Sequence, residues 1–392
     1  MNKATKDSNF ALTPLLQEMA SGKLGPGYKK AFQLINGLAR VYKSRRLIPV
    51  NSVQISGVSY KNIGKMGIEF LKSLASPQVR VPTTLNPACY EPFLQKLHLD
   101  EEIRGQNEII KLYSEMGVQT SLTCAPYFYG NKPEYSQHIA WAESSAVVYA
   151  NSVLGARTNR EGGPSALAAA LTGFTPEYGL HLTDNRRPQV KIILEKTPAN
   201  SLEWGLLGCW TGINHKNTIP LFFPESSSSP TEEDLQSLGA ALITWGGAPL
   251  FHISQTTPEA DIFPEPENSV NCTIEDLEII QRQISYQPQT KDEIDFVYLG
   301  CPHYSIAKLD EVFNKFNAQN IKTGIGGPHQ NLLGEIPSSS GLTYFGGSCI
   351  AVSYLLPAIR TVATNSVKAC FYLMNRGIKT VLLPEDECLN LK

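Results

Sequence analysis

Three cysteines lie just beyond short apolar or glycine-rich segments of this chain. Cys301 ends the apolar run FVYLG, Cys124 ends the run TSLT, and Cys349 follows the turn YFGGS. A proline stands close behind each of the first two cysteines. Both runs have the composition of short buried strands, and ligands of open α/β sheets bind at the carboxyl ends of the strands. The three thiols are therefore candidates for chemistry.

Three interpretations of these thiols compete. A nucleophile made from Cys301 and His303 is the weaker one, because no orienting group or oxyanion hole is obvious nearby. His303 is better interpreted as a turn residue or as a support for a ligand. Three thiolates at one site suit an iron–sulfur cluster with an open iron, and an open iron acts as a Lewis acid. The third interpretation is that the thiols are buried as small hydrophobic groups and that no cluster forms.

The other five cysteines are predicted to be core residues, because cysteine is among the most buried residue types. The eight cysteines of the chain contain no CxxC pair and no zinc-finger spacing. The predicted core cysteines are Cys89, Cys209, Cys272, Cys370 and Cys388.

Several polar segments could hold a substrate. The SGVSY turn offers backbone N–H groups and a hydroxyl to an anion, and TTLNP places an asparagine at the end of a strand. Glu143 and Ser144 begin an apolar helix, a position that suits capping and anion binding. Arg160, in TNREGG, can pair with a carboxylate or a phosphate. Taken singly, each segment is equally well explained as a helix cap or a turn.

The elements that must position these residues alternate along the chain. Residues 12–50 have helical periodicity, and short strands and amphipathic helices follow one another after them. This alternation predicts an α/β protein with mostly parallel strand pairing. Two polar, proline-containing stretches, residues 224–234 and 257–269, are predicted to be loops.

Composition excludes several classes of protein. The chain has 392 residues, of which 42% are hydrophobic and 18% charged, enough for a large core. With 34 basic and 36 acidic residues and no basic stripe, a nucleic-acid binder is not expected. The chain contains no apolar run of 18 residues, so no membrane span is expected. The N-terminus has no apolar core like that of a signal peptide. We therefore expect reduced thiols and a cytoplasmic location.

Seven segments of the chain resemble segments of a known family and follow one another in the order found in that family. They are IPVNSVQISGVSY, VPTTLNP, LTCAPY, WAESSAVVYANSVLGARTNREGGP, YLGCPH, GSCI and VATNSVKACFYL. The chain resembles the large subunit of the aconitase X family over nearly its whole length. It is most similar to the archaeal-type members that act as phosphomevalonate dehydratase. The branch that acts on cis-3-hydroxy-L-proline is the alternative, as is a non-catalytic relative without a cluster.

The resemblance implies an iron–sulfur hydro-lyase that converts (R)-5-phosphomevalonate to trans-anhydromevalonate 5-phosphate. It implies an aconitase-like catalytic region over residues 8–392, with possible subdomains at about 45–185, 186–290 and 291–365. The cofactor would be a [4Fe–4S] cluster with one open iron, with [2Fe–2S] as the other possibility. A small swivelling domain that supplies a serine base is expected on a separate chain, so the partner would be a small subunit.

Site residues are implied by the same resemblance. The cluster ligands would be Cys124, Cys301 and Cys349. The substrate and catalytic positions would be Gly57, Val58, Ser59, Asn86, Pro87, Glu143 and Ser144.

Two positions depart from the pattern of the family. Gln54 stands where relatives commonly have histidine, and Gly347 stands where they commonly have an acidic residue. Groups around a metal ligand tune the site strongly. An altered substrate or a looser cluster is the expected consequence of these departures.

Overall fold

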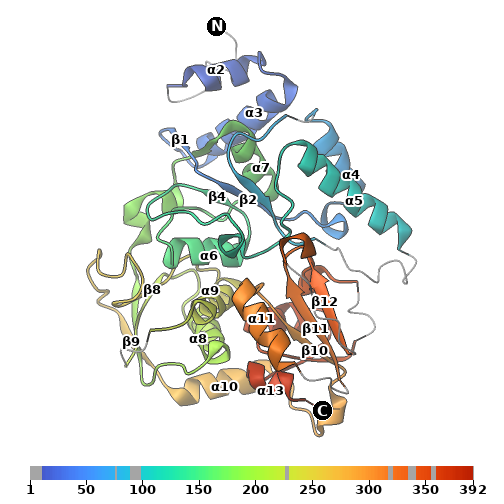
Figure 1. Cartoon of the computed structure of the whole chain (residues 1–392). Coiled ribbons are helices and arrows are strands. Elements are labelled where there is room, and N and C mark those ends of the chain that lie inside the picture. The colour runs from blue at the N-terminus through green and yellow to red at the C-terminus, as the bar shows by residue number, and fades with distance from the viewer. Residues whose placement is uncertain are drawn as a thin grey trace.

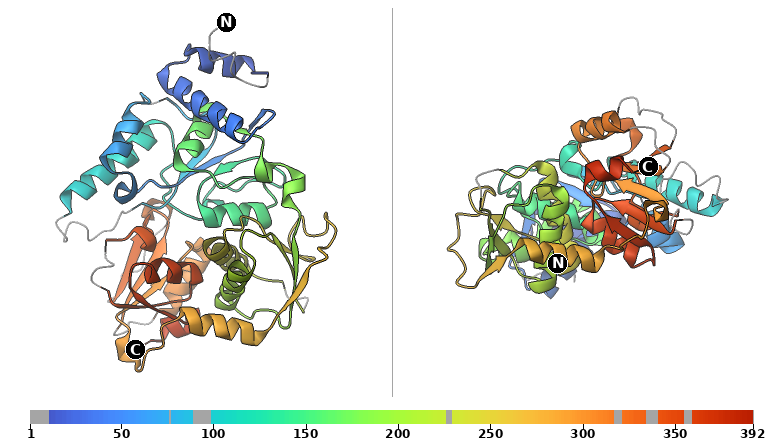
Figure 2. Two further views of the ribbon diagram at one scale, coloured as in Figure 1. Left: turned by 180° about the vertical axis from the view of Figure 1, so that it is seen from behind. Right: turned by 90° about the horizontal axis from the view of Figure 1, so that it is seen from below.

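The computed structural model describes residues 11–75, 77–88, 99–225, 229–316, 321–333, 341–354 and 359–391. Cys89, one of the predicted core cysteines, lies outside these residues. Three α/β units follow one another along the chain, each with its own parallel sheet. In both side views the first unit forms one end of the molecule, and the other two lie side by side at the opposite end (Figure 1, Figure 2).

The N-terminal segment forms two helices, α2 (Pro14–Ser21) and α3 (Pro26–Val41). The first helix ends at Gly22, which adopts a left-handed conformation. The predicted helical stretch of residues 12–50 is wrong at its end, because residues there form β1 (Leu47–Pro49). This strand pairs antiparallel with β5 (Phe174–Pro176), a partner more than a hundred residues away that local periodicity does not reveal.

The first unit is built on the parallel sheet β3-β2-β4, with β2 (Val53–Ile55) in the centre. Its strands are short, and their side chains are buried. The remaining elements of this unit are β3 (Thr83–Leu85), β4 (Ala140–Trp141), α4 (Tyr60–Lys72), α5 (Asp100–Glu115), α6 (Ser144–Ser152) and α7 (Gly163–Thr172).

The second unit contains the parallel sheet β8-β7-β6-β9 and two closely packed helices, α8 (Ser201–Asn214) and α9 (Glu232–Gly246). Each of these helices begins at a residue whose side chain accepts a hydrogen bond from the backbone of the first turn, Asn200 and Thr231. The other elements are β6 (Val190–Leu194), β7 (Pro220–Phe223), β8 (His252–Ile253), β9 (Ser269–Cys272) and α10 (Ile274–Ile284).

The third unit contains the parallel sheet β12-β11-β10-β13-β14. The apolar run before Cys301 forms β10 (Phe296–Leu299), as the sequence predicts, and all four of its side chains are buried. The sheet continues beyond residue 365, because β14 pairs with β13. The other elements are β11 (Lys322–Gly327), β12 (Leu342–Gly346), β13 (Thr361–Thr364), β14 (Lys379–Leu382), α11 (Ile306–Lys315), α12 (Val367–Met374) and α13 (Glu385–Leu389).

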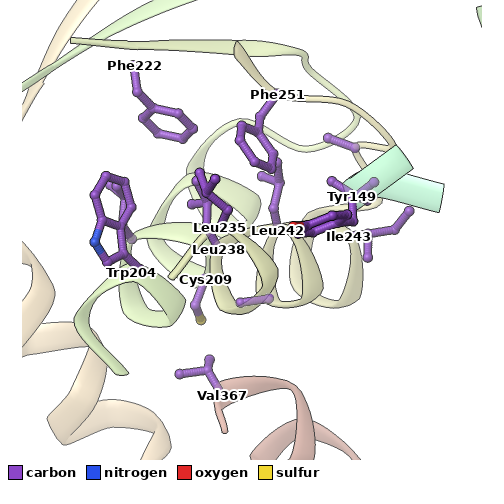
Figure 3. Packing of buried hydrophobic residues seen from close by; sticks show 14 of the residues in the cluster. Tyr149, Trp204, Cys209, Phe222, Leu235, Leu238, Leu242, Ile243, Phe251 and Val367 are labelled. Carbon is purple, nitrogen blue, oxygen red and sulfur yellow. The ribbon is translucent and has the colours of Figure 1, made fainter. Parts of the chain in front are cut away.

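One hydrophobic core joins the three units. Figure 3 shows Trp204 of α8 on the side of Phe222 in the second sheet and Cys209 of α8 pointing toward Val367 of the third unit, with Tyr149 of the first unit in the same cluster. Burying each large apolar side chain is worth about 1.5–3 kcal/mol. The shared core therefore fixes the units relative to one another.

The predicted parallel α/β class is confirmed, because the only antiparallel pair among the described strands is β1–β5. The predicted strand at residues 120–123 is wrong. Leu122 has a φ of 46°, which breaks the pleat, although the Thr123 N–H still bonds the Leu85 carbonyl beside β3. Within the described ranges, no helix has the length and apolarity that a bilayer crossing requires.

Candidate functional site

The site lies where the carboxyl edges of the first and third sheets meet. The Ala88 N–H bonds the Gly347 carbonyl at 2.9 Å, and the His329 N–H bonds the Ser121 carbonyl at 3.0 Å. Each bond joins a loop of the first sheet to a loop of the third. Because all strands in each sheet are parallel, the loops that follow them gather at one edge. Polar loops from two sheets therefore face each other.

Three predicted segments follow the three strands of the first sheet. Gly57, Val58 and Ser59 come after β2, Asn86 and Pro87 come directly after β3, and Glu143 and Ser144 come after β4. The structure thus brings together these substrate and catalytic candidates, which the sequence spreads over almost ninety residues.

The loop after β2 contains a left-handed glycine and a buried hydroxyl. Gly57 is exposed and has a φ of 73°, a backbone conformation that favours glycine. Ser59 is 1% exposed, and its hydroxyl has no hydrogen-bond partner among the described residues. Gln106 of α5 holds the loop, donating to the Val58 carbonyl at 3.1 Å and accepting from the Tyr60 N–H at 2.9 Å. The buried hydroxyl is left available to a ligand.

Gln54, the first departure from the family pattern, is fully buried on β2 and makes three hydrogen bonds. Its amide N–H groups donate to Asn86 Oδ1 at 3.2 Å and to the Thr123 carbonyl at 2.8 Å, and its Oε1 accepts from the Thr84 hydroxyl. Accepting from Gln54 fixes the orientation of the Asn86 amide, whose Nδ2 then donates to Glu143 at 2.8 Å. Glutamine is therefore fully accommodated at this position.

Lys368 is a site residue that sequence reasoning missed. It lies in the first turn of α12, and its ammonium donates to Glu143 Oε1 at 2.7 Å and to the Ser145 hydroxyl at 3.0 Å. The side chains of Lys368 and Glu143 are 8% and 13% exposed. A signal was present in the sequence, because a single lysine in the apolar run SVKACFYL is costly to bury without a partner.

Each member of this pair keeps the other charged. Burial acts to raise the pKa of Glu143, but the Lys368 ammonium and hydrogen bonds from Lys368, Asn86 and Ser145 lower that pKa below its ordinary value. Burial acts to lower the pKa of Lys368, but the negative charges of Glu143 and nearby thiolates raise it well above its ordinary value. At neutral pH the site therefore contains a buried carboxylate and a buried ammonium.

The three candidate thiols come from three separate segments. Cys301 follows β10, Cys349 follows β12, and Cys124 follows the irregular segment beside β3. All three are free thiols; Cys124 is 7% exposed, and the other two are half-buried. Cys209, Cys272, Cys370 and Cys388 are buried, as predicted for core cysteines.

The donor spacing constrains what these thiols can bind. In the described part of the chain, no three histidine, cysteine or acidic side chains are close enough together to hold a single metal ion. A cluster binds each thiolate through a different iron, so its ligands are spaced more widely than those of one ion. The three thiol-bearing segments meet at His303, two residues after Cys301, whose N–H donates to Cys124 Sγ at 3.2 Å and whose ring lies 3.0 Å from the Ser348 carbonyl. Three thiols on neighbouring loops are the donor type that iron–sulfur clusters use.

Burial is the main influence on the thiols. It raises the pKa of Cys349 to about 12 and also raises those of Cys301 and Cys124, while the Lys368 ammonium lowers all three. A thiol nucleophile requires a lowered pKa, and these thiols have the opposite shift. A bound metal deprotonates coordinating thiols outright.

His303 does not serve Cys301 as a base. Its ring is 2% exposed, with Nδ1 at 3.2 Å from the Thr123 hydroxyl and Nε2 at 3.0 Å from the Ser348 carbonyl. Its backbone N–H donates to Cys124 Sγ at 3.2 Å. Burial is the main cause that lowers the pKa of His303 to about 4, so its ring is neutral. Both ring nitrogens are occupied, which removes the basis for a Cys301–His303 nucleophile.

Gly347, the second departure, is required by the backbone. It has a φ of 73°, and a side chain there would approach Leu122 Cβ and Cδ1 at 3.0 Å. Its N–H and C=O bond Gly327 and Ala88, so the residue cannot shift freely. A side chain here would be strained by the positive φ and would press on Leu122, so glycine suits this position next to Cys349.

The remaining two candidates lie at the rim. Ser144 is the half-buried first residue of α6, directly after Glu143. Arg160 is exposed and forms a β-bridge with Trp141, and Gly163, which begins α7 directly after this loop, lies against the Ser56 carbonyl. The Arg160 loop therefore borders the turn that contains Gly57.

Comparisons with known proteins agree with this architecture. The sequence profile described as "Aconitase X first domain" matches residues 9–184, and that described as "Aconitase X second domain" matches residues 188–287. The phosphomevalonate dehydratase large subunit of Thermococcus kodakarensis is 36% identical, over 97% of this chain and 98% of that protein. The Methanosarcina mazei large subunit is also 36% identical, over 97% of this chain and 96% of its own length.

A solved structure and a second group of relatives extend the comparison. The crystal structure of Thermococcus kodakaraensis aconitase X in its holo-form has a TM-score of 0.86 at 33% identity and covers 97% of this chain and all of that one. The cis-3-hydroxy-L-proline dehydratase of Hypocrea jecorina is 32% identical over 74% of this chain, but over only 50% of its own length. Fold, site and similarity together define an α/β hydro-lyase, a dehydratase. The chain belongs to the aconitase X family.

Proposed function

We propose that this chain is the large subunit of a dehydratase that removes water from (R)-5-phosphomevalonate to give trans-anhydromevalonate 5-phosphate. The observation that carries the proposal is the meeting of two sheet edges, where the turn at Gly57, a buried Lys368–Glu143 pair and three thiols lie on neighbouring loops. The near full-length similarity to phosphomevalonate dehydratase large subunits supports this substrate over cis-3-hydroxy-L-proline, whose dehydratases this chain matches over about half their length.

Cys124, Cys301 and Cys349 would hold an iron–sulfur cluster, which we infer to be [4Fe–4S] with one open iron. When bound, such a cluster supplies a Lewis acid for the substrate hydroxyl. The holo-form structure of a close relative supports a bound cofactor in this family. Iron and sulfide analysis distinguishes [4Fe–4S] from a [2Fe–2S] alternative.

The substrate is anionic at both ends, and the site offers positive groups for each. The turn at Gly57, Val58 and Ser59 is proposed to hold the phosphate through its backbone N–H groups and the buried Ser59 hydroxyl, which has no partner among the described residues. Arg160, at the rim, is proposed to pair with the same group. Asn86 and Pro87 would line the side of the pocket next to Glu143.

Lys368 and Glu143 would act on the reacting end. Because Glu143 is ionised, it is a proton acceptor and an orienting group, and it aims the Lys368 ammonium and the Asn86 amide. The Lys368 ammonium would hold the substrate carboxylate and stabilise the negative charge that develops as the neighbouring C–H proton leaves. Ser144, beside Glu143, would contact the substrate.

The base that removes this proton is expected from a second chain. Relatives of this chain are named large subunits, which implies a partner subunit. We propose a small swivelling-domain subunit that closes the site and supplies a serine base. We also propose that the catalytic region of this chain divides into subdomains at about 45–185, 186–290 and 291–365.

The test is anaerobic reconstitution of the chain with iron, sulfide and its small subunit, followed by parallel assays on (R)-5-phosphomevalonate and cis-3-hydroxy-L-proline. Water loss from the first substrate alone is the expected result. Turnover of the second alone refutes the substrate, and a cluster-loaded complex that turns over neither refutes the function.

Serine variants test the ligands separately. Cys124→Ser, Cys301→Ser and Cys349→Ser should each lose the visible absorption of the cluster. Cys272→Ser is the matched control, because Cys272 also ends a parallel strand but lies in the second sheet. Retention of the absorption in all three site variants would remove the cluster assignment.

A further inference from the structure

His303 touches all three thiol-bearing segments at once. It lies two residues after Cys301, its N–H donates to Cys124 Sγ at 3.2 Å, and its ring approaches Ser348, the residue before Cys349, at 3.0 Å. These segments belong to two different sheets and are not joined by a shared strand. The His303 side chain therefore lies between the three thiol-bearing segments and links them.

Every polar group of His303 has a partner. Nδ1 faces the Thr123 hydroxyl at 3.2 Å, Nε2 faces the Ser348 carbonyl at 3.0 Å, and the carbonyl of His303 accepts from Gln236 of α9 at 3.1 Å. Gln236 also donates to the Tyr127 hydroxyl, so this residue anchors the loop to the second unit as well. A side chain held on all sides in this way is a rigid support, not a mobile acid or base.

The partners determine which ring nitrogen carries the hydrogen. A backbone carbonyl only accepts, so Nε2 carries the hydrogen and donates to Ser348. Nδ1 is then an acceptor, and the Thr123 hydroxyl donates to it while accepting from the Ala125 N–H at 3.1 Å. The ring thus makes one directional bond to the residue before Cys124 and another to the residue before Cys349.

We propose that His303 is a positioning residue: by bonding Thr123 through Nδ1 and Ser348 through Nε2–H, it sets the separation of the Cys124 and Cys349 segments around Cys301. The proposal rests on the proposed cluster site. Loss of a group that orients metal ligands typically lowers metal affinity or activity about 10- to 100-fold. The arrangement also predicts an effect that is specific to each segment, which a general loss of stability does not produce.

Two near-isosteric variants separate the two bonds. His303→Asn places an amide near the position of Nδ1, so it keeps the contact with Thr123 and loses Ser348. His303→Gln reaches the position of Nε2, so it keeps the contact with Ser348 and loses Thr123. His303→Ala loses both. His252→Ala is the matched control, because His252 is equally buried and its Nε2 bonds a backbone carbonyl at 2.8 Å, but it lies in the second sheet.

The first measurement uses the full-length chain without cluster: the alkylation rate of each cysteine by iodoacetamide, read by mass spectrometry. His303→Ala should speed alkylation of both Cys124 and Cys349 at least several-fold relative to His252→Ala. His303→Asn should speed only Cys349, and His303→Gln only Cys124. Equal rates in the His303 and His252 variants, or the same change at every thiol, would overturn the proposal; if His303→Ala does not fold, the amide variants decide alone.

The second measurement uses the reconstituted chain with its small subunit: the rate of cluster loss to an iron chelator, followed by visible absorption. We expect loss about tenfold faster in His303→Ala than in the wild type or His252→Ala, with partial rescue in each amide variant. Unchanged loss in His303→Ala contradicts the positioning role. If the wild type takes up no cluster, the proposed function fails, and the alkylation result still decides whether His303 positions the segments.

Discussion

Replacing Lys368 with methionine removes one partner of the buried ion pair and keeps an unbranched side chain that is only one atom shorter. Glu143 then keeps hydrogen bonds from Asn86 and Ser145 but loses the opposite charge at 2.7 Å. Removing one partner of a buried pair costs about 3–5 kcal/mol, because the remaining charge is uncompensated. We expect a loss of this size in the free energy of unfolding of the cluster-free chain at pH 8.

The pH dependence gives a sharper test. In the wild type the pKa of Glu143 is lowered, so its contribution to stability is present above the ordinary carboxyl pKa and is lost as the pH falls through the lowered value. Without Lys368, burial is the dominant influence and raises that pKa. The contribution of Glu143 should then be lost as the pH rises, so the variant should lose less stability at pH 5 than at pH 8.

A double-mutant cycle measures the coupling free energy between Lys368 and Glu143. It compares urea unfolding of the wild type, Lys368→Met, Glu143→Gln and the double variant, each at pH 5 and pH 8. In the double variant the neutral amide cannot ionise, so the inverted pH dependence should disappear. A loss below about 1 kcal/mol for Lys368→Met, the usual range for exposed ion pairs, would refute the reasoning. So would a loss that is the same at both pH values.

Three further changes test other parts of the site and its surroundings. Gly347→Asp should destabilise the chain by more than about 1 kcal/mol in thermal unfolding, because it strains a left-handed residue and meets Leu122 at 3.0 Å; unchanged stability would mean that the acidic residue of relatives fits here too. Gln54→Leu should cost about 1–3 kcal/mol and raise KM for the proposed substrate, (R)-5-phosphomevalonate, because Asn86 loses the donor that orients its amide. An unchanged KM would count against that role. Burial raises the pKa of Glu161, so the stability that its neutral form contributes is lost as the pH rises through that raised pKa. Glu161→Gln should therefore flatten the decline of the free energy of unfolding with rising pH. Identical pH profiles for the variant and the wild type would contradict this assignment.

Side-chain periodicity and capping within short segments were sufficient to predict many elements of this protein. The apolar run before Cys301 forms a buried strand, and Glu143 begins an apolar helix, because both depend on side-chain periodicity and capping within a few residues. Parallel pairing also followed from the alternation of helices and strands. Where local signals misled, the cause was local geometry or a distant partner: Leu122 turns the segment before Cys124, and β1 pairs with β5.

The sequence by itself determined that Cys301 and Asn86 stand just beyond buried strands, because the runs before them have the length and composition of strands. Only the tertiary structure decided which side chains meet. Lys368 lies 225 residues from Glu143, and His303 lies 180 residues from Thr123, yet each pair is in contact. These contacts depend on how the carboxyl edges of two sheets dock against each other. That docking is fixed by a core shared among three units, and no periodicity in the chain encodes it.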